Sequence, residues 1–191
     1  MAEIYEGAYL PGENPRAQSG FGGDETRWEA GRRAIVEAID RDGSFLDVGC
    51  ASGLLLESVV SWSPHRIEPF GLELAPRLAD LARSRLPRWA DRIFVGNALT
   101  WEPPRRFDFV RTELVYVPDG RRAVYVRRLL AAVVAPAGRL IVCGYGSPRS
   151  GVPTEPAGAV LRELGFTPEL ELSAVAPEGG PLAEVAALRA R

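Results

Sequence analysis

Lysine is absent from this chain of 191 residues, so all 23 of its basic side chains are arginines. Codon bias in a GC-rich genome is the simplest explanation of that preference. The absence still has consequences for function. It excludes Schiff-base chemistry, the lysine of a phosphate-binding loop, and the Tyr-Lys pair of short-chain dehydrogenases.

Histidine, cysteine and long apolar segments are also scarce. The single histidine, His65, and the two cysteines, Cys50 and Cys143, have no spacing typical of a metal site or a disulfide framework, so no metal is expected. No apolar run reaches the ~18 residues needed to cross a bilayer. The first residues, 1–6, do not begin a signal peptide. We therefore expect a cytoplasmic protein with no membrane partner.

Length and composition are those of an ordinary globular domain. Hydrophobic residues make up 46% and charged residues 25%, and the formal charge of -2 gives no overall field that would attract nucleic acid. We expect one structural domain, in which residues 1–43 form an N-terminal arm and a helix and residues 44–191 form the main body.

Short apolar segments alternate with helical patterns along the chain. Strands are predicted near 44–48, 69–73, 93–95, 107–110 and 139–143, separated by helices that begin near Leu54, Pro76 and Val124. This alternation predicts an α/β fold, a doubly wound and mostly parallel sheet with helices on both faces.

The secondary structure at the two ends of the chain is less clearly indicated by the sequence. Residues 1–23 have little periodicity and are expected to be an irregular arm, followed by a helix with a capping box at 26–29 and a stop at Gly43. Residues 182–188 have good helix propensity, yet they follow the apolar segment 170–175 across a Gly-Gly turn. The pattern alone leaves helix and strand open there.

Two acidic residues at predicted strand ends indicate a ligand site. Asp47 precedes a tight turn of small residues from Gly49 to Gly53, where a helix begins, so the backbone can approach a ligand closely. An acid at this position suits a cationic amine better than a pyrophosphate. Glu73 closes the next strand, at the spacing of a ribose-binding carboxylate.

These motifs resemble the nucleoside-binding motifs of class I S-adenosylmethionine-dependent methyltransferases. The Asp47–Gly53 turn, Glu73, the segment 96–98 and the strand 107–110 follow one another in the family's order. The resemblance covers residues 44–191 and implies a sheet of the class I type with an antiparallel C-terminal hairpin strand. Residues 182–188 are therefore expected to be a strand.

The resemblance also implies binding roles for S-adenosylmethionine and its product S-adenosylhomocysteine. Asp47 would hold the methionine amino group, Glu73 the ribose hydroxyls, and Glu113 would face the methionine end. The remaining cofactor-binding positions are turn residues and adenine contacts: Gly49, Cys50, Ala51, Gly53, Leu74, Asn97 and Ala98. Two of them depart from the family, since Ala51 replaces a usual glycine and Asn97 a frequent aspartate, whose oxygen can still accept a hydrogen bond.

The catalytic residues are less clearly marked. His65 precedes a strand and so belongs at the edge of the sheet opposite the ligand. Glu113 and Tyr116 follow the fourth strand at the ligand edge, and we take them as the catalytic candidates, with Tyr145 as a further substrate contact. The Asn-Pro-Pro-aromatic motif of adenine- and glutamine-methylating enzymes is absent.

The arm is expected to close the site as a lid, with a disordered tail as the alternative. Arg16, Gln18, Ser19 and Phe21 are its candidates for contacts with the cofactor or acceptor. A small-molecule acceptor is expected because the chain shows no added recognition domain. An RNA or protein methyltransferase and a catalytically silent S-adenosylmethionine-binding module are the alternatives. A nicotinamide dehydrogenase is a weaker rival, because Gly49 and Gly53 do not form a Gly-x-Gly-x-x-Gly motif.

Overall fold

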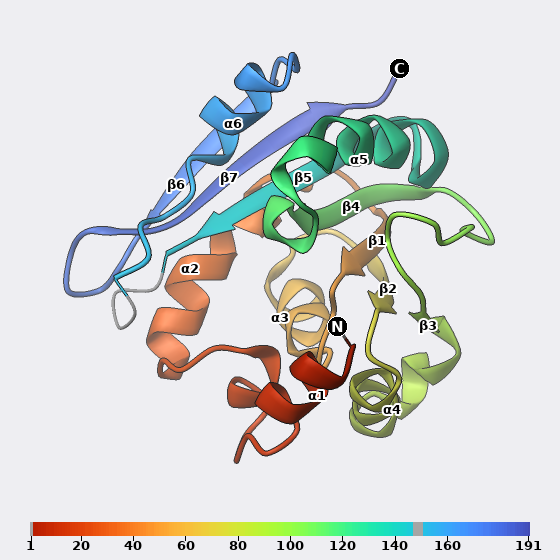
Figure 1. Ribbon diagram of the computed structural model, residues 1–191, viewed down its shortest axis with the longest axis vertical. Helices are drawn as coiled ribbons and strands as arrows, with labels where there is room; N and C mark the ends of the chain where they lie inside the picture. Colours follow the sequence, from red (N-terminus) through yellow and green to blue (C-terminus); the bar gives the residue numbers. More distant parts are fainter. Residues whose placement is uncertain (1, 147–150) are drawn as a thin grey trace.

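A computed structural model describes residues 2–146 and 151–191, and it is organised around one seven-stranded sheet (Figure 1). The strands are β1 (Gly43–Val48), β2 (Ile67–Glu73), β3 (Ile93–Val95), β4 (Phe107–Glu113), β5 (Val134–Tyr145), β6 (Leu170–Val175) and β7 (Pro181–Arg189). Their order across the sheet is β3-β2-β1-β4-β5-β7-β6. The first five strands are parallel, and β7 runs antiparallel to both of its neighbours. The expected fold class is confirmed.

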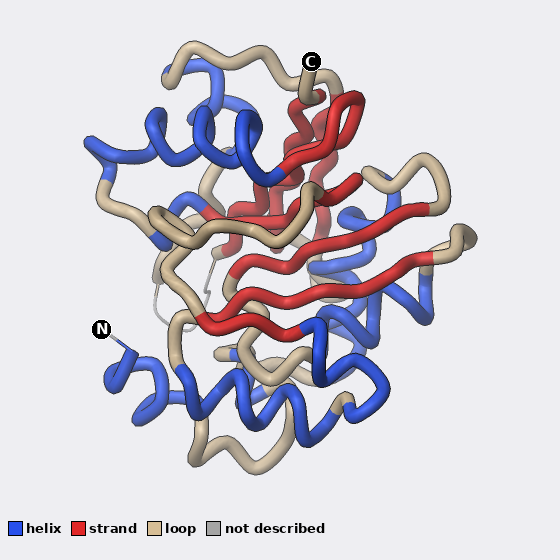
Figure 2. Tube along the Cα trace, turned by 90° about the vertical axis from the view of Figure 1, so that its right-hand side faces the viewer, coloured by secondary structure: helices blue, strands red, loops and turns tan. Residues whose placement is uncertain are grey.

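Helices cover both faces of this sheet (Figures 1 and 2). They are α1 (Ala2–Tyr9), α2 (Glu25–Glu37), α3 (Leu54–Trp62), α4 (Pro76–Arg85), α5 (Arg122–Arg128) and α6 (Ala157–Glu163), with short 3-10 turns η1 (Ala17–Ser19), η2 (Pro87–Arg92), η3 (Leu114–Tyr116) and η4 (Asp119–Arg121), and a π turn η5 (Leu129–Val133). Helices α2, α3 and α4 pack on one face, and α5, η5 and α6 pack on the other.

The core explains why adjacent residues at the centre of β1 are both apolar. Its successive residues point to opposite faces, so Phe45 packs with the α2, α3 and α4 layer while Leu46 packs with the α5 layer. Both side chains are fully buried. A strand covered on both faces cannot alternate apolar and polar residues, and this pattern is typical of parallel sheets.

The C-terminal segment is a strand, as the family resemblance implied. Residues 182–188 lie within β7, between β5 and β6, and Ala183, Ala186 and Ala187 are fully buried there. Their helix propensity is overridden because a strand in this slot pairs its backbone on both sides and buries both faces.

Several expected boundaries were wrong. The cap of α2 is Asp24, whose carboxylate accepts from the backbone of Arg27 at 2.9 Å, so the helix begins before the expected capping box. That helix ends at Glu37, well short of Gly43. Strand β4 continues to Glu113, which therefore lies on the strand rather than in the segment after it.

The N-terminal arm is ordered and partly helical, which corrects the expectation of an irregular segment. The backbone amide of Arg77, at the start of α4, donates to Glu6 of α1 at 3.0 Å. The hydroxyls of Ser19 and Ser52 lie 2.7 Å apart, which ties η1 to the turn after β1. Figure 1 shows α1 beside the carboxyl ends of the parallel strands. No helix in the described part of the chain is long and apolar enough to span a membrane.

The burial of α3 against the sheet gives a direct test of this packing. Leu56 is fully buried, whereas Leu54 on the same helix is only partly buried. We expect Leu56→Ala to lower the free energy of unfolding by about 2–5 kcal/mol, because it leaves a cavity between helix and sheet. Leu54→Ala is the matched control and should cost clearly less. Urea unfolding measures both, and equal losses would contradict this orientation of α3.

Candidate functional site

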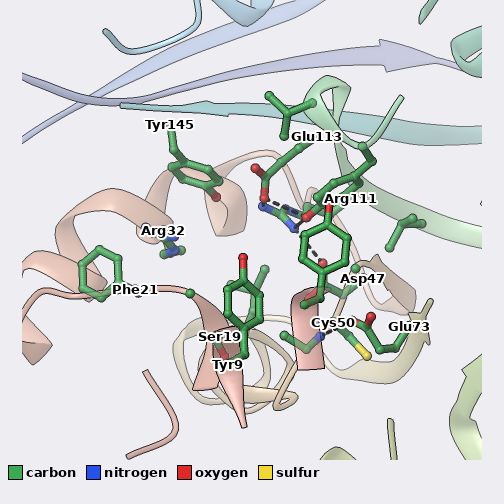
Figure 3. A pocket seen from close by; sticks show the side chains of 18 of the residues that line it. Tyr9, Ser19, Phe21, Arg32, Asp47, Cys50, Glu73, Arg111, Glu113 and Tyr145 are labelled. Carbon is green, nitrogen blue, oxygen red and sulfur yellow. Dashed lines mark hydrogen bonds and ion pairs between the residues drawn. The ribbon is translucent and has the colours of Figure 1, made fainter. Parts of the chain in front are cut away.

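A cavity of about 710 Å³ lies at the carboxyl ends of the parallel strands, within the range of small-ligand sites (Figure 3). Its floor comes from the turn after β1 and from the ends of β2 and β4. Its walls come from the arm, α2, the segment 96–98 and the end of β5. Ligands of open α/β sheets bind at this edge, next to the strand where the order reverses, which here is β1 between β2 and β4.

The turn after β1 has the backbone shape that a close ligand approach requires. Gly49 has φ +80°, and a Cβ built on it would lie 2.7 Å from the Tyr116 ring. Ala51 also has a positive φ, 44°, although it is not glycine. The glycine usual at this position in the resembled family is explained by that conformation, and the alanine accepts some strain.

Gly53 has a different place from the one expected. It has φ +76° and begins α3, but it does not line the cavity. A Cβ there would lie 2.6 Å from Leu86. Gly53 therefore shapes the turn and allows α4 to pack closely, and it is not a direct contact of a ligand in the cavity.

Glu73, on the neighbouring strand β2, stabilises the same turn by hydrogen bonds. Its two carboxylate oxygens accept from the backbone amides of Ala51 and Ala75, at 2.8 and 2.9 Å. The side chain lines the cavity but is only 6% exposed, and burial raises its pKa. Each oxygen keeps one lone pair for a ligand hydroxyl.

Asp47 lies at the end of β1 and is almost fully buried. The Arg111 guanidinium donates to its carboxylate at 3.1 Å from the adjacent strand β4. Burial raises the pKa of Asp47 to about 6, although the positive charge of Arg111 acts in the opposite direction. Asp47 therefore changes charge in a range close to neutrality.

Arg111 is the central residue that the sequence reasoning missed. It is 4% exposed and donates to Asp47, to Glu113 and to the Tyr116 hydroxyl, the last at 3.2 Å (Figure 3). Its Nε is buried without a partner in the described part of the chain. The available signal was an arginine directly after Phe109 and Val110 in a central strand, since a buried charge is stable only when paired.

Glu113 and Tyr116 are brought together in the cavity. The Tyr116 hydroxyl donates to Glu113 at 2.8 Å. Burial, followed by the nearby Glu113 carboxylate, raises the pKa of Tyr116 well above its usual value. Tyr116 is therefore a hydrogen-bond donor at neutral pH and unsuited to act as a base.

The expected adenine contacts, Leu74, Asn97 and Ala98, also line the cavity. The Asn97 side-chain oxygen accepts from the backbone amide of Leu99 at 2.9 Å, so it holds its own turn. A ligand amino group would use the second lone pair of that oxygen. The expected acceptor role of Asn97 therefore stays a prediction, now limited to one lone pair of its oxygen.

The arm contributes two of the four residues expected of it. Phe21 and Ser19 line the cavity, as does Tyr145 from the end of β5, but Arg16 and Gln18 do not. The lid role expected of Arg16 and Gln18 is therefore not supported by their position. Tyr5 and Tyr9 of α1 and Arg27 and Arg32 of α2 line it as well, and sequence reasoning missed these four because they carry no motif.

His65 lies in the loop before β2, at the opposite edge of the sheet from the cavity. Its ring nitrogen is 3.9 Å from Asp42. Across the described residues, no group of three or more His, Cys, Asp or Glu side chains is arranged to hold a metal ion.

The Asp47–Arg111 pair generates a stability prediction. We expect Arg111→Met to lower the free energy of unfolding by about 3–5 kcal/mol at pH 8, because Asp47 is left as a buried charge without its partner. The deficit should shrink at pH 5, where a carboxyl with a raised pKa takes up a proton. Adding Asp47→Asn should restore most of the loss.

Urea unfolding at both pH values measures these variants. Arg66→Gln is the control, because Arg66 pairs with Asp42 at the surface, where such pairs contribute about 0–1 kcal/mol. If Arg111→Met were as stable as the wild type at pH 8, the buried pair would not contribute to stability as proposed.

Comparison with known proteins agrees with this geometry. No protein-family model matches the chain. It is 31% identical over 131 residues to trans-aconitate 2-methyltransferase of Methylobacterium radiotolerans, which covers 68% of this chain and 48% of that protein. The chain thus spans about half the length of this curated relative.

Two solved structures share the fold across nearly the whole chain. One is the 1,6-didemethyltoxoflavin-N1-methyltransferase of Burkholderia thailandensis, bound to 1,6-didemethyltoxoflavin and S-adenosylhomocysteine, with a TM-score of 0.65, 18% identity, and coverage of 99% of this chain and 86% of that one. The other is the N-methyltransferase NodS of Bradyrhizobium japonicum with S-adenosylhomocysteine, with a TM-score of 0.63, 16% identity, and coverage of 99% and 97%.

The strand order with its antiparallel β7, the site at the carboxyl edge and the curated match agree with one another. The chain belongs to the class I, Rossmann-like family of S-adenosylmethionine-dependent methyltransferases.

Proposed function

We propose that this protein transfers a methyl group from S-adenosylmethionine to a small-molecule acceptor. The observation that carries the proposal is the pair of buried acids, Asp47 and Glu73, on either side of the left-handed turn at the cavity floor. A carboxylate for a cationic amine and a carboxylate for a diol are the two groups that an amino-acid nucleoside needs. The arm and helix of residues 1–43 would cover the methyl-transfer domain of residues 44–191.

The cavity residues suit this cofactor. The Gly49 backbone lies directly under the Tyr116 ring, where a side chain would clash. Asp47 would bind the amino group and Glu73 the ribose hydroxyls, while the adenine would lie among Leu74, Asn97 and Ala98. The turn residues Cys50 and Ala51 would pass beneath the ligand.

S-adenosylmethionine supplies a methyl group on a sulfonium sulfur that a nucleophile displaces in line. The chain then has to orient the acceptor and exclude water, and orientation alone contributes about 7–11 kcal/mol to such reactions. Glu113 and Tyr116 are the proposed catalytic residues. Tyr116 positions the Glu113 carboxylate through its donated proton, and Glu113, which accepts from both Tyr116 and Arg111, is the group placed to receive a proton from an acceptor.

A small acceptor is favoured by the enclosure of the cavity. Aromatic side chains from the arm, α2 and β5 form its walls: Tyr9, Phe21, Trp28 and Tyr145. The named relative acts on trans-aconitate and the toxoflavin enzyme binds a small heterocycle, which supports the same class. An RNA or protein acceptor and a silent binding module are the alternatives. The cytoplasmic location stays a prediction from the sequence.

Cofactor choice tests the proposal. We expect calorimetry at pH 7.5 to show S-adenosylhomocysteine and S-adenosylmethionine binding at least about a hundredfold tighter than NAD, or about 2.7 kcal/mol. The reason is that the NAD pyrophosphate would bring negative charge toward Asp47 and Glu73. Equal or tighter binding of NAD would overturn the proposed function.

The raised pKa of Asp47 predicts how cofactor binding depends on pH. Below about pH 6 the carboxyl is protonated in the free protein and cannot pair with an amine, so binding of S-adenosylhomocysteine should strengthen as pH rises from 5 to 7.5, with a midpoint near 6. Asp47→Asn should bind weakly and without this dependence. Asp91→Asn, at an exposed acid far from the cavity, is the control. A flat wild-type profile would contradict the role of Asp47.

A further inference from the structure

Arg32 of α2 is held in the cavity by aromatic rings. Its guanidinium carbon lies 4.1 Å from the centre of the Tyr145 ring, 4.4 Å from Trp28 and 4.8 Å from Phe21. These rings come from β5, α2 and the arm. Contact with three ring faces fixes the position of a guanidinium, yet it leaves the N–H groups at its edge without acceptors.

Among the described residues, Arg32 has no carboxylate partner and no hydrogen-bond acceptor. Its neighbours on the helix differ: Arg27 pairs with Glu178, and Arg33 pairs with Glu29 at the surface. Arg32 is partly buried and lines the cavity. Partial removal of a cation from water destabilises a protein unless a counter-ion compensates for it, so the geometry points to a ligand as the partner of Arg32.

The Tyr145 hydroxyl is a second, independent group in the same position. Its oxygen is buried and has no hydrogen-bond partner within the described chain, and the side chain lines the same cavity (Figure 3). Burial raises the pKa of Tyr145, so the hydroxyl keeps its proton and donates. A buried hydroxyl without a hydrogen-bond partner destabilises a protein, which a ligand acceptor would reverse.

Two adjacent donors, one of them charged, call for an anionic acceptor. A carboxylate offers two oxygens in the plane that a guanidinium recognises, and its second oxygen can accept from a hydroxyl. Glu113 and Glu178 also line the cavity, so a singly charged carboxylate meets less repulsion than a doubly charged phosphate.

We propose that Arg32 and Tyr145 bind a carboxylate of the methyl acceptor, so that the substrates are small carboxylic acids. Calling the ligand the methyl acceptor rests on the proposed function, whereas the binding of a carboxylate by Arg32 and Tyr145 does not. In this proposal the carboxylate serves to recognise the acceptor, and other residues of the cavity position the atom that receives the methyl group.

The methionine carboxylate of the cofactor is the other possible source of the same chemistry. Asp47, the proposed partner of the amino group, ends β1, whereas Tyr145 ends β5, and β4 lies between them. Two strand spacings separate these backbones by about 10 Å, but the Tyr145 ring lies 5.5 Å from the Arg111 guanidinium carbon, and Arg111 itself pairs with Asp47. Both sources offer the same carboxylate chemistry, and titration with decarboxylated S-adenosylmethionine distinguishes them.

Calorimetry with matched neutral compounds tests the proposal. The probes are cinnamate against cinnamamide, fumarate against fumaramide, and trans-aconitate against its trimethyl ester, each with the free protein and with the protein saturated with S-adenosylhomocysteine. We expect at least one acid to bind about 10- to 100-fold tighter than its neutral match, the range for hydrogen bonds to a charged group. Failure of every acid to exceed its neutral match would overturn the proposal.

Variants assign the effect to the two residues. Arg32→Gln should remove the preference for the acid, and Arg32→Lys should restore part of it. Tyr145→Phe should weaken acid binding by about 3- to 10-fold. Because the Tyr145 hydroxyl has no partner among the residues that the structure describes, this variant should fold at least as stably as the wild type. Arg33→Gln is the matched control on the same helix and should change nothing.

Titrations with the cofactor distinguish a failure of this proposal from a failure of the proposed function. Wild-type and Arg32→Gln proteins are titrated with S-adenosylmethionine and with its decarboxylated analogue. If Arg32→Gln binds both ligands as tightly as the wild type does, the acceptor assignment is supported. Selective loss for the carboxylated cofactor would overturn it and assign Arg32 to the cofactor. Absence of cofactor binding by the wild type would overturn the methyltransferase function, while the acid preference of the free protein would still be measurable.

Discussion

The contacts of Glu73 with the turn after β1 are the interaction on which the site depends. One carboxylate oxygen holds the amide of Ala51 and the other holds the amide of Ala75, so a single side chain fixes the loops that follow two adjacent strands. Ala51 has a left-handed backbone that a non-glycine residue rarely adopts, and this bond offsets part of its cost. The start of α3, the position of Gly49 under Tyr116 and the cavity floor all follow from that turn.

The second constraint is electrostatic. Asp47 and Glu113 lie close together on adjacent strands, and Arg111 between them lets both approach one cavity in a buried setting. In the proposed function, a cationic ligand amine at Asp47 would share that carboxylate with Arg111. The raised pKa of Asp47 reflects that its burial outweighs its partner.

The arm and α2 complete the cavity from outside the sheet. Tyr9 lies against Gly20 within the arm, and Phe21 and Trp28 meet edge to face at 5.4 Å, so the covering layer is packed aromatic structure. Together with Tyr145 these rings hold Arg32 in place. The cavity floor is thus built by strand ends and the turn after β1, whereas Arg32 is held by α2, the arm and the Tyr145 ring at the end of β5.

Local periodicity and spacing along the chain were enough to predict the parallel sheet and the Asp47–Gly53 and Glu73 motifs. Contacts between segments distant in sequence determined what these local patterns left open. Residues 182–188 became a strand because β5 and β6 flank them, against their helix propensity. Arg111 meets Asp47, and Arg32 meets Tyr145, across more than 60 residues of the chain, and a contact between segments that no motif links leaves no local signal.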